Sequence, residues 1–240
     1  MNTIWTIAKK EYQLALRSVT SYIVYILFLV ISGSFFSTSI FKIGLAELRS
    51  VYSFMHLLFI FFIPAITMSS IAKERSNGTL ELLSTMPIRL SHVVWGKILG
   101  SIMQLKTILL FSVVYLGIIA FFGEGLDLGA LILGFVGIMF AGSAYVSIGV
   151  FASSLPSNQV LAFIIGFAIS AVFYIIRYIM MVVPIPLVRY VQFFSFEYHL
   201  GSFYKGVIDS RDVLFFVAVT VIFALLAEFN MQSRNLMQER

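Results

Sequence analysis

Residues that could do chemistry are few in this sequence and lie far apart. The three histidines, His56, His92 and His199, are widely separated, so we interpret each as an interfacial or loop residue rather than as part of a metal or nucleophilic group. The absence of cysteine excludes disulfides, thiolate metal sites and cysteine nucleophiles. No phosphate-binding loop, dinucleotide fingerprint or His-Glu-x-x-His motif is present. The sequence therefore predicts no catalytic residue and no metal or cofactor site on this chain.

Ionisable side chains near the middle of a membrane helix would indicate transport driven by protons or sodium ions. The candidates here are Lys106, Arg177 and Glu228. Each lies within about two turns of the end of a hydrophobic run, where a long side chain reaches the interface by snorkelling. Ion coupling is therefore disfavoured, and we expect the work for any movement to come from another subunit.

The densest charged stretch covers residues 73–89 and lies between two long hydrophobic runs. Asn77-Gly78 supplies a turn, because glycine adopts positive φ without a steric penalty. Residues 79–85 are predicted to form a short helix that ends before Pro87. Its apolar side chains form one patch: Leu80, Leu82, Leu83 and Met86. Such a patch suits docking into a cleft of a partner, and an amphipathic connector lying on the bilayer is the alternative.

The composition identifies the chain as a polytopic membrane protein. Of the 240 residues, 60% are hydrophobic and 11% are charged, whereas soluble domains are roughly 45–50% apolar and about 25% charged. At about 20 residues for each spanning helix, this length allows about six spans in a single all-α domain covering residues 1–240. We therefore interpret the net charge of +5 through the division of Lys and Arg across a membrane, and we expect no nucleic-acid partner.

Six spans are predicted, preceded by an amphipathic interfacial helix over residues 1–20. Along that helix, apolar residues from Trp5 to Val19 recur at spacings of three and four, although a solvated lead-in is the alternative. The predicted spans cover residues 22–40, 54–71, 98–122, 128–152, 160–183 and 213–229. In the fourth span, small residues recur at spacings of four and three, which predicts a helix-packing stripe. They are Ala130, Gly134, Gly137, Ala141 and Ala144.

The segment between the fifth and sixth predicted spans begins with Pro184 and Pro186 and is rich in aromatic residues. Aromatic rings favour the membrane interface, so we expect short re-entrant or interfacial helices here. An even number of spans places both termini and residues 73–89 on one side. That side carries nine Lys and Arg residues against five on the other, which predicts that both termini are cytoplasmic.

The charged segment resembles the Glu-Arg-x-x-Gly-Thr-Leu-Glu-x-Leu…Pro-Ile signature of the permeases of type-2 ATP-binding-cassette (ABC) exporters. The matching residues are Glu74, Arg75, Gly78, Thr79, Leu80, Glu81, Leu82, Leu83, Pro87 and Ile88. The stretch 195–212 is similar to the outer segment of the gliding-motility branch of that family. The resemblance covers the whole chain, including the entry helix and the six spans.

This resemblance implies a permease subunit of the bacterial inner membrane that dimerises with a second permease copy or a related permease. Two copies of a cytoplasmic ATPase would hold the ATP and magnesium, and an extracytoplasmic accessory subunit often joins members of this branch. Glu74, Arg75, Gly78, Thr79, Leu80, Glu81, Leu82, Leu83 and Pro87 would couple ATP hydrolysis to the spans.

Two other functions remain open at this stage. A complex of the same architecture could transmit ATPase motion to a periplasmic partner without moving a solute. A membrane enzyme could instead use the outer segment, with Glu197, His199 and Asp209 as its polar group.

Overall fold

Long apolar helices dominate the structure, as the composition predicts. The computed structural model describes residues 2–43, 49–79, 89–122, 127–180 and 182–238. The helices in these ranges are α1 (Asn2–Leu16), α2 (Val19–Ile43), α3 (Arg49–Thr67), α4 (Ala72–Ser76), α6 (Leu90–Phe122), α7 (Leu128–Ser154), α8 (Gln159–Ile179), α9 (Ile185–Gln192), α10 (Phe196–Tyr204) and α11 (Ser210–Gln238). Six stretches are long and apolar enough to cross a membrane: Val19–Ser39, Arg49–Ser76, Leu90–Tyr115, Leu128–Ser154, Gln159–Ile179 and Ser210–Ser233. The predicted all-helical class is confirmed.

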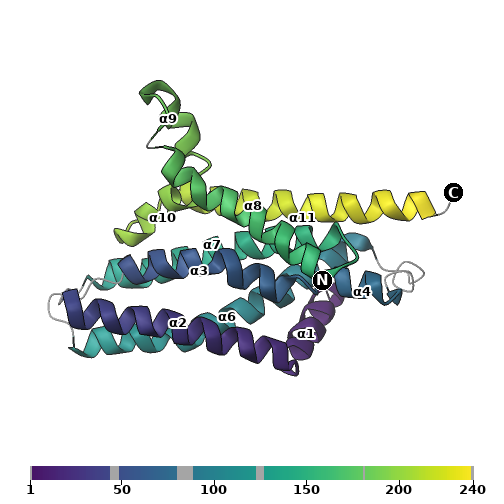
Figure 1. Cartoon of the computed structure of the whole chain (residues 1–240), viewed down its shortest axis with the longest axis horizontal. Coiled ribbons are helices and arrows are strands. Elements are labelled where there is room, and N and C mark those ends of the chain that lie inside the picture. The colour runs from purple at the N-terminus through teal and green to yellow at the C-terminus, as the bar shows by residue number, and fades with distance from the viewer. Residues whose placement is uncertain (1, 44–48, 80–88, 123–126, 181, 239–240) are drawn as a thin grey trace.

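Helix α7 is the centre of the bundle and contacts α3, α6, α8, α10 and α11 (Figure 1). Small residues let these neighbours approach it closely. A Cβ atom on Gly137 would lie 2.7 Å from Cβ of Phe203 in α10, and Gly134 lies against the ring of Tyr52 in α3. Ala141 and Ala144 are fully buried, and Ala130 is half-buried. The small residues therefore face more than one neighbouring helix.

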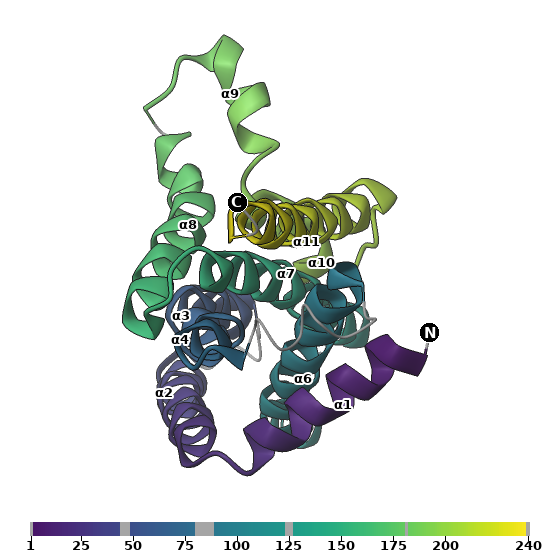
Figure 2. The same cartoon turned by 90° about the vertical axis from the view of Figure 1, so that its right-hand side faces the viewer.

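Helix α1 runs across the long helices and packs on α6 (Figure 2). Gly96 and Gly100 of α6 allow this contact, since a Cβ on Gly100 would lie 3.1 Å from the backbone oxygen of Ala8. Ala8 and Ala15 are buried in the contact, whereas Trp5 is 57% exposed. The face that packs on α6 shares Ala8 with the predicted apolar stripe and leaves Trp5 exposed.

Two helices begin earlier than the hydrophobic runs from which we predicted them. Helix α6 begins at Leu90 and includes Lys97, and α3 begins at Arg49. The predicted span begins directly after Lys97, because a charged residue usually marks the end of a membrane helix. In the structure Lys97 lies inside α6 and is 1% exposed. The carboxylates that permit its burial come from distant parts of the sequence.

At the end of the bundle opposite α4, helix α9 projects away from the long helices (Figure 1). The next helix, α10, is instead packed into the bundle, where Phe196, Leu200 and Phe203 are fully buried. Gly206 then turns the chain with φ +76°, and a Cβ there would lie 2.9 Å from the amide nitrogen of Ala130. Both the conformation and the close approach require glycine.

Candidate functional site

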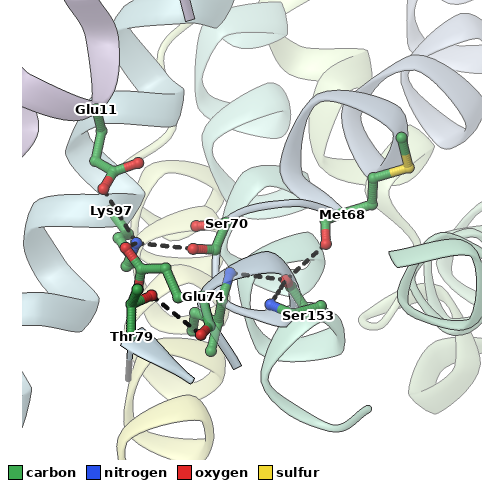
Figure 3. A network of polar contacts seen from close by, with 9 residues as sticks. Glu11, Met68, Ser70, Glu74, Thr79, Lys97 and Ser153 are labelled. Carbon is green, nitrogen blue, oxygen red and sulfur yellow. Dashed lines mark hydrogen bonds and ion pairs between the residues drawn. The ribbon is translucent and has the colours of Figure 1, made fainter. Parts of the chain in front are cut away.

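A buried ion cluster lies where α1, α6 and the α3–α4 turn meet (Figure 3). At its centre, Nζ of Lys97 lies 3.1 Å from Oε1 of Glu11 and 2.7 Å from Oε1 of Glu74. The same ammonium donates a hydrogen bond of 2.7 Å to the backbone oxygen of Ser70. Three acceptors match the three hydrogens of an ammonium group. Lys97 therefore joins the entry helix, the α3–α4 turn and the start of the predicted coupling segment.

The charges of this cluster do not cancel. Two carboxylates face one ammonium, and Oε2 of Glu74 is buried with no hydrogen-bond partner among the described residues. The carboxylates keep about a fifth of their side-chain surface exposed, at 20% for Glu11 and 22% for Glu74, beside a cavity of about 260 Å³. Removing one partner from a buried ion pair costs about 3–5 kcal/mol, because the other charge is left uncompensated. The cluster is therefore sensitive to any movement of its three elements.

Arg75 links the same segment to the centre of the bundle. Its Nη1 donates hydrogen bonds to the backbone oxygens of Ser154 at 2.6 Å and Leu155 at 3.2 Å, at the end of α7. The last carbonyl groups of a helix lack partners within the helix and carry partial negative charge. A guanidinium placed there supplies both hydrogen-bond donors and a positive charge, so Arg75 caps α7.

Ser153 makes a second connection between α7 and α4. Its Oγ accepts hydrogen bonds of 3.0 Å from the amides of Ile71 and Ala72 and donates one of 2.9 Å to the oxygen of Met68. The first amides of a helix need acceptors, which a side chain of the same segment usually supplies. Here a neighbouring helix supplies the acceptor (Figure 3), so α4 is bonded to α7 at its beginning and through Arg75.

The structure describes four of the residues that we predicted to couple ATP hydrolysis. Glu74 and Arg75 lie in α4, Gly78 turns the chain with φ +70°, and Oγ1 of Thr79 donates a 3.1 Å hydrogen bond to the oxygen of Glu74. The other predicted coupling residues lie outside the described ranges: Leu80, Glu81, Leu82, Leu83 and Pro87. Our sequence reasoning did not identify the pair of Lys97 and Glu11, because these residues are 86 positions apart in the chain.

A second polar cluster corrects our interpretation of His56 as an interfacial or loop residue. His56 is fully buried in α3, with Nδ1 3.0 Å from Oε2 of Glu197 and Nε2 2.9 Å from the hydroxyl of Tyr145. Oε1 of Glu197 also accepts a 3.1 Å hydrogen bond from Ser53 and lies 3.5 Å from Nη1 of Arg177. Arg177 is therefore an ion-pair partner as well as a residue near a span end. The cluster joins α3, α7, α8 and α10.

The electrostatics of Glu197 reflect these partners. Burial acts to raise the pKa of its carboxyl group, but the hydrogen bond from His56 and the charge of Arg177 outweigh burial. The pKa of Glu197 therefore lies below its usual range, and the carboxylate is the stable form at neutral pH.

His199 is likewise buried, which corrects its assignment as an interfacial or loop residue. Its Nδ1 lies 2.7 Å from Oδ1 of Asp212, and its Nε2 lies 2.9 Å from the oxygen of Phe193. A carbonyl only accepts hydrogen bonds, so Nε2 carries a hydrogen, and Nδ1 and Asp212 share one further proton. Asp209 instead caps α11 through the amide of Arg211 at 2.9 Å. Glu197, His199 and Asp209 line one cavity but are bonded to different partners.

The fold and these clusters define a polytopic helical membrane protein whose described polar clusters are ion pairs and helix caps that join the helices. The family model described as ABC-2 family transporter protein matches residues 3–229 of the 240, so the chain belongs to that family. No curated protein matched the sequence. Members of this family are membrane subunits of ABC transporters, so the chain is a permease subunit. Family membership implies a cytoplasmic ABC ATPase as its partner and often a second permease.

Proposed function

We propose that this chain is the permease of an ATP-driven exporter in a bacterial inner membrane, with both termini cytoplasmic. Two copies of a separate ATPase would bind ATP and magnesium and act on residues 73–89. The observation that supports this proposal is the bonding of Glu74 and Arg75, at the start of that segment, to two different parts of the bundle. A segment bonded in this way can pass a displacement to several spans at once.

The contacts suggest two routes for such a displacement. One runs from Glu74 through Lys97 to α6 and, through Glu11, to α1. The other runs from Arg75 and Ser153 to the end of α7, which contacts α3, α6, α8, α10 and α11. Packed helices move as rigid elements with small shifts between discrete arrangements. Movement of α4 would therefore reach the centre of the bundle without passing through a loop.

The permease dimer is part of this proposal. The apolar stretches of α2 and α8 have few buried residues, and their exposed side chains include Ile26, Val30, Leu161 and Ile164. We propose that α2, α3 and α8 contribute to the contact with the second permease, where exposed apolar faces of two copies would meet.

The docking role of residues 80–88 is tested with Leu83→Asp. The charge would oppose burial of the apolar patch in the ATPase, so the variant should insert in the membrane but no longer co-purify with the ATPase. Asn77→Asp adds the same charge at an exposed position of the segment and should keep the ATPase. Co-purification of Leu83→Asp at the level of the control would contradict the docking role.

A second candidate function is transmission of ATPase motion to an extracytoplasmic partner, as in the gliding-motility branch that residues 195–212 resemble. The projection of α9 from the bundle favours it, because Leu187 and Tyr190 on this helix are 53% and 70% exposed (Figure 2). If this function is correct, Leu187→Glu/Tyr190→Glu should release an accessory subunit that co-purifies with the wild type, while the ATPase stays bound. Retention of every co-purifying protein would count against it.

A further inference from the structure

A cavity of about 580 Å³ lies among α9, α10 and the start of α11. Helices α9 and α10 lie at the end of the bundle opposite α4 (Figure 1). Four basic residues from four different elements line it: Arg49, Arg189, Lys205 and Arg211. They belong to the start of α3, to α9, to the turn after α10 and to α11. All four are exposed. Cations that are distant in the sequence therefore converge on one hollow.

These four cations have no ion-pair partner in the part of the chain that the structure describes. The acidic residues of the same cavity are already engaged. Glu197 is paired with Arg177, and Asp212 and His199 share a proton, which leaves each pair neutral. Asp209 accepts a hydrogen bond from the amide of Arg211. The cavity thus offers four positive charges against the single uncompensated charge of Asp209, an excess that attracts an anion.

The backbone of α10 and of the turn that carries Lys205 is held in place. Phe196, Leu200 and Phe203 anchor α10, and the ring of His199 is bonded on both sides. The turn that presents Lys205 is closed by a 3.1 Å hydrogen bond from the amide of Val207 to the oxygen of Ser202. Its Gly206 lies against Ala130 of α7. A site whose backbone is already ordered loses less entropy when a ligand binds.

Exposed apolar side chains lie close in the sequence to the basic residues of the cavity. On the same segment, Tyr190 is 70% exposed, Phe194 is 57% exposed and Ile208 is 57% exposed. Exposed aromatic residues next to Arg and Lys are typical of the level at which lipid headgroups meet the hydrocarbon region. A ligand that contacts both the basic cavity and these apolar side chains carries an anionic group together with an apolar tail.

We propose that this cavity binds a phosphate-type anion, carried by an amphiphile at the membrane surface, through Arg49, Arg189, Lys205 and Arg211. Guanidinium groups match the oxygens of phosphate with paired hydrogen bonds, and lysine adds a point charge. The proposal does not depend on ATPase coupling, because the cavity lies at the other end of the bundle from α4. If the test rejects the anion site, the ATPase-coupling proposal is unaffected, and the reverse also holds.

The test uses the purified full chain in a zwitterionic detergent and calorimetric titration with three probes. These are a short-chain phosphatidylglycerol, the phosphatidylcholine with the same chains, and inorganic phosphate. The protein variants are Arg189→Gln/Arg211→Gln, the charge-preserving Arg189→Lys/Arg211→Lys, and Lys9→Gln/Lys10→Gln, which removes two exposed charges from α1. We expect phosphatidylglycerol to bind the wild type at least about tenfold more tightly than phosphatidylcholine, since each contact to a charged group is strong.

The Gln double variant should lose at least about tenfold in affinity for phosphatidylglycerol. The Lys double variant should lose less, because it keeps the charge but not the paired hydrogen bonds, and the α1 control should stay within about threefold of the wild type. Competition by inorganic phosphate would identify a free anion as a sufficient ligand, and its failure would identify the lipid, each in line with a phosphate site. Equal binding of the two lipids, or an equal loss in the α1 control, would overturn the proposal. The Lys variant separates loss of charge from loss of folding.

Discussion

Lys97 joins three elements at the end of the bundle that carries α4. Its ammonium group is 1% exposed and has three acceptors, two of them carboxylates from other elements. A lysine is buried only where such partners are present, because transfer of an isolated charge from water is very unfavourable. The burial of Lys97 and the docking of α1 therefore require each other.

Lys97→Met should destabilise the protein, because it leaves Glu11 and Glu74 facing each other without a cation. We expect a loss of up to about 3–5 kcal/mol in unfolding free energy, reduced by the partial exposure of both carboxylates. Thermal unfolding in detergent measures it. Lys106→Met, an exposed position on the same helix, should change stability by less than about 0.5 kcal/mol. Equal effects of the two substitutions would contradict the role of the ion cluster.

Glu197 makes stability depend on pH. Its folded-state pKa lies below the usual value of 4.5, so its contribution is complete above pH 4.5 and is lost as the pH falls through the folded-state pKa. The melting temperature should therefore fall less steeply with acid in Glu197→Gln than in the wild type. Glu228→Gln, whose carboxylate is bonded to Gln232, should keep the wild-type slope. A wild-type slope in Glu197→Gln would show that this carboxylate is not the group responsible.

At the residue scale, sequence reasoning identified Glu74 and Arg75 because they belong to a local pattern. It did not identify Lys97, Glu11 or the buried pairs of His56 and His199, because each depends on a partner at least 13 positions away in the chain. A spacing rule within one helix cannot detect such a pair. The glycines at 96 and 100, four positions apart in one helix, were a signal that we did not use.

At the scale of elements, α10 and the turn after it attach the proposed anion-binding cavity to the bundle. Helix α10 is short, yet it is buried by aromatic contacts, including the ring of Phe196 at 4.7 Å from that of Tyr145 and 5.0 Å from that of Phe173. The composition predicted short helices in this region from Pro184, Pro186 and the aromatic residues. It did not predict that α9 projects while α10 packs inside, because both are rich in the same residue types.

Gly206→Ala should destabilise the turn after α10. The positive φ of +76° is unfavourable for alanine, and its Cβ would lie 2.9 Å from the amide nitrogen of Ala130. We expect a loss of about 1–3 kcal/mol in unfolding free energy. Gly201→Ala is the matched control inside α10, where a Cβ meets no atom within 4 Å, and it should be neutral or stabilising by about 0.5–1 kcal/mol. Thermal unfolding of both variants checks the difference, and equal stability would show that the turn is not constrained.

At the scale of the whole molecule, α7 is the element that both ends of the bundle share. Its C-terminal end is bonded to α4 through Arg75 and Ser153, and its N-terminal half lies against α10 and the turn at Gly206. The number and class of the spans followed from composition and run length. Their arrangement around α7 could not be derived from the sequence, because the small residues face several helices and their spacing alone does not say which.

We propose that ATPase work enters through α4 and reaches α1 through Lys97 and α7 through Arg75. The absence of cysteine allows spin labels at Thr3→Cys on α1 and Ser157→Cys after α7, both exposed positions. Double electron–electron resonance spectroscopy would measure the distance between the two labels in the complex with its ATPase, with and without trapped ATP. We expect a nucleotide-dependent change in the wild type and in Lys106→Met, and a smaller change in Lys97→Met with the ATPase still bound, because only the route through Arg75 and Ser153 to α7 then remains. The same change in Lys97→Met as in the wild type would contradict the proposal.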